Sequence, residues 1–290
     1  MRQAFIGVDV GTSSARAGVF DETGALLATA RHPITVWHEA GNVVEQSSSE
    51  IWAACADSVR AAMAEAALPP AAIRGIGFDA TCSLVVLDAA ADPLTVSTSG
   101  DERRNVIVWM DHRATAEARL VNDTHDDVLR YVGGSISPEM EVPKLLWLKR
   151  HLPSSYHAAG HFFDLADYLS FRATGSTTRS ICTLACKWNF LAHERRWSGS
   201  YFERVGLGDL ASGVSVDQRR ADRRPLEQTE IARGRSGQAG AQRRAGRDDF
   251  LSDFRVLIRG DISKPDALEK TAAPAPLVGQ EIPFAGKRAY

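Results

Sequence analysis

Residues 5–20 constrain the fold of this chain more than any other segment. Two apolar runs, at residues 5–10 and 15–20, flank a short polar turn at residues 11–14 that contains a glycine. Apolar runs of this length on both sides of such a turn predict two antiparallel strands joined by a tight hairpin. The fold must therefore begin with a β-hairpin whose turn is polar.

The hairpin turn carries groups suited to phosphate binding. Gly11 can adopt backbone conformations with positive φ, and the hydroxyl and N–H groups of Thr12 and Ser13 can contact phosphate oxygens. Asp9 ends the first strand, where its carboxylate can hold a metal ion through water. The turn is not a Walker A loop, because the G-x-x-x-x-G-K-[ST] spacing is missing and a strand follows it. An ordinary hairpin, in which the hydroxyls only cap the turn, is the structural alternative.

The remaining elements are predicted from apolar periodicity, capping residues and breakers. A third strand is expected at Ala25–Ala30. Further strands are expected at residues 73–79, 84–88 and 106–109, with Ala80–Ser83 as the polar connection between the first two; helices are expected at 47–69, 115–131, 138–151 and 164–175. Pro143 should shift the start of its helix or kink it. This order predicts an α/β fold with a ribonuclease H-like sheet, in which a three-stranded antiparallel meander opens a mixed sheet.

Composition narrows the class of protein. The 34 Lys and Arg nearly balance the 36 Asp and Glu, which argues against nucleic acid and against an anionic membrane surface as partners. No apolar run is long enough to span a membrane and no leader precedes the first strand, so a cytoplasmic protein is expected. The four cysteines, Cys55, Cys82, Cys182 and Cys186, form no C-x-x-C pair, and we expect them to be reduced and not to bind metal.

The composition changes after Gly213. Between Asp217 and Asp249 the only large apolar residues are Leu226 and Ile231, and nine arginines stand among glycine, glutamine and alanine. Burial of so little apolar surface cannot offset the conformational entropy that the segment would lose on folding. A largely disordered tail is therefore expected. We therefore predict a folded domain at 1–213, a disordered segment at 214–250 and an atypical tail at 251–290.

Four further motifs occur together with the hairpin. They are Gly77-Phe78-Asp79-Ala80-Thr81-Cys82-Ser83-Leu84-Val85, Trp109-Met110-Asp111-His112-Arg113-Ala114, Glu139-Met140-Glu141-Val142-Pro143-Lys144-Leu145-Leu146-Trp147-Leu148-Lys149 and Cys182-Thr183-Leu184-Ala185-Cys186-Lys187-Trp188. With these motifs in this order, residues 3–210 resemble the FGGY carbohydrate kinases. Among them, the chain is most similar to pentulose kinases of the D-ribulokinase type.

The resemblance implies a fold, a reaction and site residues. Members of the family have two domains of the actin-like ATPase superfamily, with ATP and the sugar between them. It implies that Asp9, Gly11, Thr12, Ser13 and Arg16 face the nucleotide phosphates, with Asp9 on Mg²⁺ through water, and that Thr81, Cys82, Ser83, Asp111, Glu139 and Lys187 line the sugar pocket. The implied reaction is ATP-dependent conversion of D-ribulose into D-ribulose 5-phosphate, and a homodimer is the implied assembly. Ribitol, L-ribulose and xylulose remain alternative substrates.

Structural alternatives apply to several of these residues. Asp111 can cap the following helix, Lys187 can be a solvated surface lysine, and Glu139 can favour the first turn of its helix. We expect structural roles for His112 and Trp109. The three side chains assigned to core packing are Trp52, Phe78 and Trp147.

The chain departs from the family after Gly213. No segment of the G-x-x-D-x-H-A-G type, whose aspartate is the general base of the family, is found, so no catalytic residue is predicted. The switch in composition resembles the result of a reading-frame change or a truncation. We therefore expect impaired catalysis, and a non-catalytic remnant that binds sugar or a partner protein is the alternative.

Overall fold

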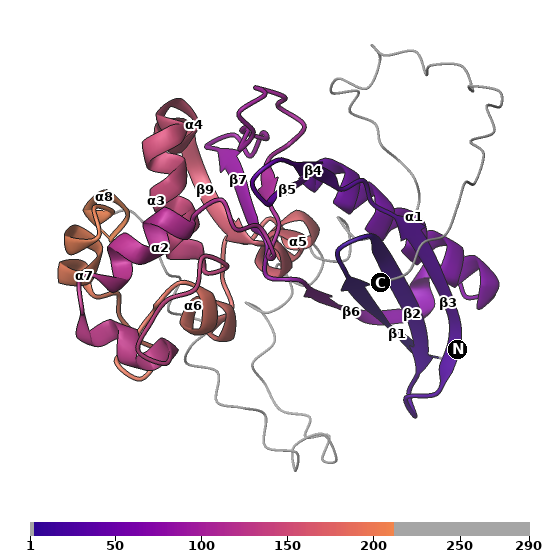
Figure 1. The fold of residues 1–290 in the computed structure, drawn as a ribbon. Helices are drawn as coiled ribbons and strands as arrows, with labels where there is room; N and C mark the ends of the chain where they lie inside the picture. Colours follow the sequence, from indigo (N-terminus) through magenta and orange to yellow (C-terminus); the bar gives the residue numbers. More distant parts are fainter. Residues whose placement is uncertain (1–2, 212–290) are drawn as a thin grey trace, which may run out of the picture.

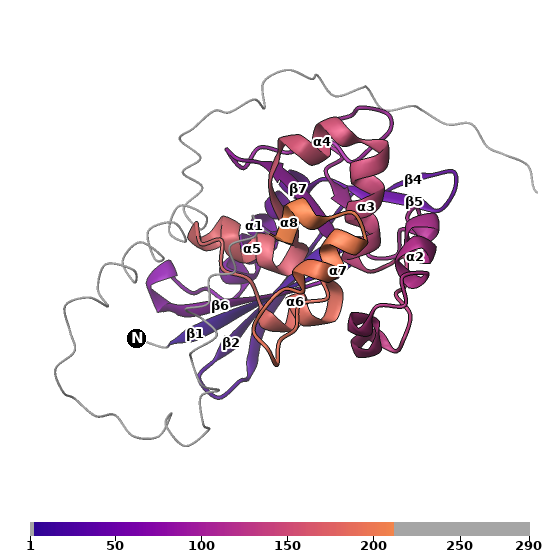
Figure 2. The same ribbon diagram turned by 90° about the vertical axis from the view of Figure 1, so that its left-hand side faces the viewer.

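The computed structural model describes residues 3–211, which form two β-sheets and a group of helices (Figure 1). The expectations for 214–250 and 251–290 lie outside the described residues. In Figure 1 one sheet lies at the N-terminal end and most helices lie at the opposite end. Figure 2 views the molecule from the helical side, so that the helices drawn in orange lie toward the viewer.

The N-terminal sheet has four strands in the order β3-β2-β1-β6. Strands β1 (Ala4–Val10), β2 (Ser14–Asp21) and β3 (Leu26–Pro33) form the antiparallel meander. Strand β6 (Ile73–Ala80) pairs with β1 in parallel, which makes the sheet mixed as predicted.

One face of this sheet is covered and the other is open. Ala4, Ile6, Val8 and Val10 alternate along β1 and are buried in a core shared with α1 (Ser48–Glu65) and α5 (Leu165–Thr174). On the other face Phe5 and Leu26 are exposed. The period of two in the sequence thus directs one set of side chains inward and the other outward.

A row of glycines crosses the open face. Gly7 of β1 lies opposite Gly18 of β2 and opposite Gly77 of β6, so three neighbouring strands carry glycine at paired positions. The ring of Phe20 lies next to this row, since a Cβ atom added at Gly18 would be 2.9 Å from Phe20 Cε2. A side chain at residue 18 would therefore displace the Phe20 ring.

The second sheet is antiparallel throughout, with the order β4-β5-β8-β7-β9. Its strands are β4 (Trp37–Glu39), β5 (Val43–Gln46), β7 (Leu84–Asp88), β8 (Val106–Ile107) and β9 (Ala159–Asp164). Sequence reasoning missed β4, β5 and β9 and overestimated the length of β8. It also did not foresee that the segment at 84–88 joins a different sheet from 73–79.

The helices outside the first sheet complete a second core. They are α2 (Thr115–Asn122), α3 (Glu141–His151), α4 (Pro153–Ala158), α6 (Ile181–Lys187), α7 (Gly199–Arg204) and α8 (Gly208–Ala211), with the short 3₁₀ turn η2 (Asp127–Val132). Another 3₁₀ turn, η1 (Pro70–Ala72), leads into β6 of the first sheet. Trp147 is buried in this core as expected, while Trp52 and Phe78 pack at the edge of the first core. No helix within residues 3–211 has the length and apolar character needed to cross a membrane.

Two predicted helices have different bounds in the structure. The helix predicted at 115–131 was wrong: α2 ends at Asn122, His125 has a φ of 49°, and the Asp126 side chain then accepts a hydrogen bond from Val128 N at the start of η2. The helix predicted at 138–151 begins only at Glu141, so that Pro143 lies in the first turn, where its missing N–H leaves no bond unmade. The N-cap of α1 by Ser47 and the ends of α5 at Asp164 and Gly175 agree with the prediction.

Gly160→Ala should destabilise the protein strongly for a single methyl group. A Cβ atom at residue 160 would be 2.5 Å from Ala89 Cα, a contact with backbone that only a shift of β9 against β7 can relieve. We expect a loss of about 1–3 kcal/mol in the free energy of unfolding, measured by urea denaturation. Gly77→Ala is the matched strand control, because nothing lies within 4 Å of its Cβ position. Equal stability of the two variants would contradict this packing.

Candidate functional site

The turn of the first hairpin is closed by Gly11 and overlaid by Arg16. Gly11 N donates to Ser14 O over 3.0 Å, and Arg16 Nη2 lies 2.7 Å from Asp9 Oδ2, with both side chains about half exposed. Gly11 does not have the positive φ that the sequence suggested. A Cβ atom at residue 11 would lie 3.3 Å from Arg16 Nη2 and would crowd the guanidinium group. The guanidinium group can therefore lie over the turn, close to solvent.

Asp9 has an acidic neighbour that sequence reasoning missed. Asp79 of β6 lies opposite Asp9 in the parallel pairing, and both are exposed. Paired residues of neighbouring strands point to the same face, so the two carboxylates and Arg16 are adjacent. The position of Asp79 beside Asp9 follows from the register between β1 and β6, which cannot be read from the sequence.

Oxygen donors of this kind suit Mg²⁺, which usually binds one or two carboxylates and keeps several waters. Among the described residues no group of three or more His, Cys, Asp or Glu could hold a metal ion by itself. Asp9 and Asp79 therefore fit a water-mediated site better than a full protein cage.

Thr12 connects the hairpin to the second sheet. Its carbonyl oxygen accepts from Gln46 Nε2 over 2.6 Å, and its hydroxyl accepts from Trp109 Nε1 over 3.1 Å. Trp109 N donates to Ser83 Oγ over 3.1 Å. Trp109, expected to be only structural, thus bridges the hairpin and the turn at 81–83.

The turn at 81–83 is also bonded to the end of β1. Thr81 N donates to Val10 O over 3.0 Å, and Thr81 Oγ1 lies 3.3 Å from Ser83 Oγ. Ser83 is fully buried, whereas Thr81 and Cys82 are partly exposed. Of the three predicted sugar contacts in this turn, Thr81 and Cys82 are the accessible ones.

Charges from α3, α6 and β9 surround Cys82. Burial raises the pKa of the Cys82 thiol, Asp164 and Glu141 raise this pKa further, and Lys187 and Lys144 lower it. Lys187, at the end of α6, is therefore close enough to Cys82 for its charge to matter. The charge of Lys187 thus acts at another of the predicted sugar residues.

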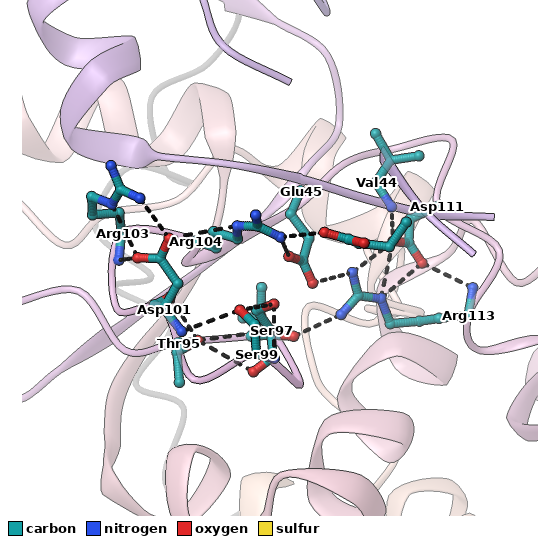
Figure 3. Close-up of polar contacts among 12 residues, drawn as sticks. Val44, Glu45, Thr95, Ser97, Ser99, Asp101, Arg103, Arg104, Asp111 and Arg113 are labelled. Carbon is teal, nitrogen blue, oxygen red and sulfur yellow. Dashed lines mark hydrogen bonds and ion pairs between the residues drawn. The ribbon is translucent and has the colours of Figure 1, made fainter. Parts of the chain in front are cut away.

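Asp111 has a different environment from the other predicted residues. It is fully buried; its Oδ2 accepts from Val44 N over 2.6 Å and from Arg113 Nη2 over 2.7 Å, and its Oδ1 accepts from Arg113 N over 2.8 Å (Figure 3). Glu45 Oε1 accepts from the same guanidinium group over 2.9 Å. The carboxylate oxygens of Asp111 are thus occupied within the protein, and its contact with a sugar stays a prediction.

Glu139 lies before α3 and is open to solvent. Its Oε1 is 2.9 Å from His112 Nε2, and both side chains are partly exposed. The two residues therefore tie the loop before α2 to the loop before α3. Glu139 can exchange this partner for a ligand at little cost, because exposed ion pairs contribute little.

Comparison with known proteins decides the family. Residues 4–210 match the profile described as the N-terminal domain of the FGGY family of carbohydrate kinases. The chain belongs to this family. This FGGY chain is 50% identical over 209 residues to the FGGY carbohydrate kinase domain-containing protein of Homo sapiens, a match that covers 72% of the chain and 37% of the relative. It is 44% identical over 215 residues to a D-ribulokinase of Saccharomyces cerevisiae, covering 71% of the chain and 30% of that protein. The FGGY chain thus spans about a third of the length of these relatives.

Solved structures confirm the fold. A gluconate kinase from Lactobacillus acidophilus superimposes with a TM-score of 0.62 at 20% identity, covering 71% of the FGGY chain and 40% of that kinase. A xylulose kinase from the same organism superimposes with a TM-score of 0.61 at 20% identity, with the same coverage. The predicted α/β fold, in which an antiparallel meander opens a mixed sheet, and the predicted membership of the FGGY carbohydrate kinases are both confirmed.

A cavity of about 400 Å³ lies apart from these residues. Aromatic side chains including Tyr156, Trp188 and Trp197 line it, together with Arg179. None of the predicted phosphate or sugar residues lines this cavity. The candidate site of the FGGY chain is therefore the surface formed by the hairpin, the turn at 81–83, Trp109 and Lys187.

Arg113→Met should be among the most damaging substitutions near the site. It would leave the buried carboxylates of Asp111 and Glu45 without their shared cation, at a cost of about 3–5 kcal/mol in the free energy of unfolding. Arg103→Met is the matched control, because Arg103 pairs with Asp101 but is largely exposed, and a change below about 1 kcal/mol is expected. Denaturant unfolding of both variants measures the difference. Similar losses in the two variants would show that burial does not determine how much these ion pairs contribute to the free energy of unfolding.

Proposed function

We propose that residues 4–210 form the sugar-binding and phosphate-facing domain of an ATP-dependent pentulose kinase, with D-ribulose as substrate and D-ribulose 5-phosphate as product. The observation that carries this proposal is the double contact of Trp109, which joins the phosphate hairpin at Thr12 to the sugar turn at Ser83. A kinase must hold phosphate and acceptor hydroxyl close together, because phosphoryl transfer depends chiefly on positioning and charge neutralisation.

The residue types around Cys82 support a polyhydroxylated substrate. The Thr81 hydroxyl can donate and accept, and the Lys187 ammonium group can donate to a sugar carbonyl or hydroxyl oxygen. Identity of 44% to a protein named D-ribulokinase supports D-ribulose over xylulose, L-ribulose and ribitol.

The hairpin supports ATP and Mg²⁺ as the second substrate and its metal. Backbone N–H groups at Thr12 and Ser13 and the Arg16 guanidinium group offer donors to phosphate oxygens. Asp9, with Asp79 beside it, would hold Mg²⁺ through water, and the ion would neutralise phosphate charge. The chain's own residues bind and orient the two substrates, and we assign no general base to any of them.

The family match ends at residue 210 and covers about a third of the relatives. We therefore propose that the 290-residue chain binds the sugar without appreciable turnover. ADP release by the purified chain with Mg-ATP, with and without D-ribulose, tests this. We expect no sugar-dependent release; sugar-dependent ADP release would mean that later residues or a second subunit complete the site. The second candidate is a non-catalytic remnant of such a kinase that binds sugar or a partner protein, and the same limited match supports it.

Lys187→Met should weaken sugar binding. Loss of a charged hydrogen-bond donor is expected to raise the Kd for D-ribulose roughly 10- to 100-fold, measured by isothermal titration calorimetry with the 290-residue chain. The control is Lys149→Met, because Lys149 pairs with Asp209 on α8 and is not part of the candidate site. An unchanged Kd for Lys187→Met would show that Lys187 is the solvated surface lysine of the structural alternative. No binding by any form would reject D-ribulose.

A further inference from the structure

Three charged side chains lie in the interior next to the candidate site. Glu141 and Lys144, in the first turn of α3, are fully buried, and Asp164, the last residue of β9, is 2% exposed. None of them was assigned a function from the sequence. They occupy the region where the end of β9, the start of α3 and the turn at 81–83 meet.

The group is incompletely bonded. Both carboxylate oxygens of Glu141, the Lys144 ammonium nitrogen and Asp164 Oδ2 are buried without a hydrogen-bond partner among the described residues. The contact between Lys144 Nζ and Glu141 Oε1 is 3.6 Å, longer than a hydrogen bond, and Asp164 Oδ1 accepts only from Ala166 N over 3.4 Å. Unpaired buried charge is costly, so two carboxylates facing one ammonium group cannot both remain ionised without large loss.

The acid–base behaviour of the group agrees with this geometry. Burial raises the pKa of Asp164 to about 8, and the charges of Glu141 and Asp167 raise it while Lys144 lowers it. Burial likewise raises the pKa of Glu141 to about 7 against the lowering effects of Lys144 and Lys187. Because the charge of Glu141 acts on Asp164, the two carboxyl groups are coupled, and the raised pKa of Asp164 favours a proton on that carboxyl group.

This group is coupled to the candidate sugar residues. Asp164 pairs with Leu84 across β9 and β7, directly after Ser83. The charges of Asp164 and Glu141 act on Cys82, and Lys187 acts on both Glu141 and Cys82. A change in the charge of Asp164 or Glu141 therefore changes the electrostatic environment of Cys82 and Lys187, the two side chains expected to contact the sugar.

We propose that Glu141 and Asp164 share one proton and form, with Lys144, an electrically neutral positioning cluster beneath the sugar pocket. With the proton in place, one carboxylate balances Lys144 and the Lys187 ammonium group is free to bind the sugar. When the proton leaves to solvent, the cluster gains a negative charge that attracts Lys187 inward, away from the sugar. This coupling rests on the proposed function, whereas the shared proton does not.

The pH dependence of unfolding without sugar tests the shared proton. The folded state holds this proton more tightly than the unfolded chain, so its stabilising effect is complete below pH about 4 and is lost as pH rises to about 8. Asp164→Asn should flatten the fall in stability between about pH 5 and pH 8, and Glu141→Gln should act in the same direction. Asp57→Asn should keep the wild-type profile, because Asp57 is a half-exposed residue that pairs with Arg60 on α1. Equal pH profiles for wild type, Asp164→Asn and Glu141→Gln would overturn the shared proton.

Titration of D-ribulose at pH 6 to 9 tests the coupling. The wild-type Kd should rise above about pH 8, by up to about tenfold per pH unit for a single linked proton, while the Kd of Asp164→Asn should stay flat. A purely structural role for Asp164 would lower stability without removing this pH dependence. Binding with the same pH profile in both forms would overturn the positioning role. No binding at any pH would overturn the proposed function and the coupling with it, while the unfolding profiles would still decide on the proton.

Discussion

The structure depends on the position of β1 between two different partners. Antiparallel pairing with β2 brings Arg16 opposite Asp9, and parallel pairing with β6 brings Asp79 opposite the same residue. The same strand ends where Thr81 N donates to Val10 O, so the turn at 81–83 is fixed relative to the hairpin. A shift of one residue in either pairing would turn these side chains to the opposite face of the sheet.

Buried charge is treated in two ways in this chain. In the network around Arg113, every carboxylate oxygen of Asp111 has a donor, and such a satisfied network makes the loop between β8 and α2 rigid. Around Asp164 and Glu141 there are too few hydrogen-bond donors for two ionised carboxylates. A proton on one of the two carboxyl groups therefore removes the charge that hydrogen bonds do not stabilise. The Arg113 network fixes the loop next to the site. The charge of the Glu141, Asp164 and Lys144 cluster, by contrast, changes with pH.

The sequence revealed those features that depend on neighbouring residues. The hairpin, the Ser47 cap of α1 and the Gly175 end of α5 follow from local turn and capping chemistry. The division into two sheets did not, because β5 and β8 meet only through pairing between distant segments, such as Gln46 with Val106. The same limit applies to the site: Thr12, Thr81 and Lys187 could be named from motifs, but Asp79, Gln46 and Asp164 acquire their importance from contacts between strands far apart in sequence. The break after Asn122 was missed because neither glycine nor proline marks it, and the positive φ occurs at His125, whereas such a conformation is uncommon for residues other than glycine.

The glycine row across Gly18, Gly7 and Gly77 affects the cost of covering the open face of the first sheet. Glycine has no rotamers to restrict, so the side-chain entropy lost by covering the row would come from the side chains that flank it on this face, Phe5 and Phe20 at one end and Asp9, Arg16 and Asp79 at the other. The backbone is open to close approach at Gly77, where nothing lies within 4 Å of the Cβ position, whereas the Phe20 ring lies next to Gly18 and Gly7. A partner surface could therefore meet bare backbone at Gly77, but at Gly7 and Gly18 it would first meet the Phe20 ring.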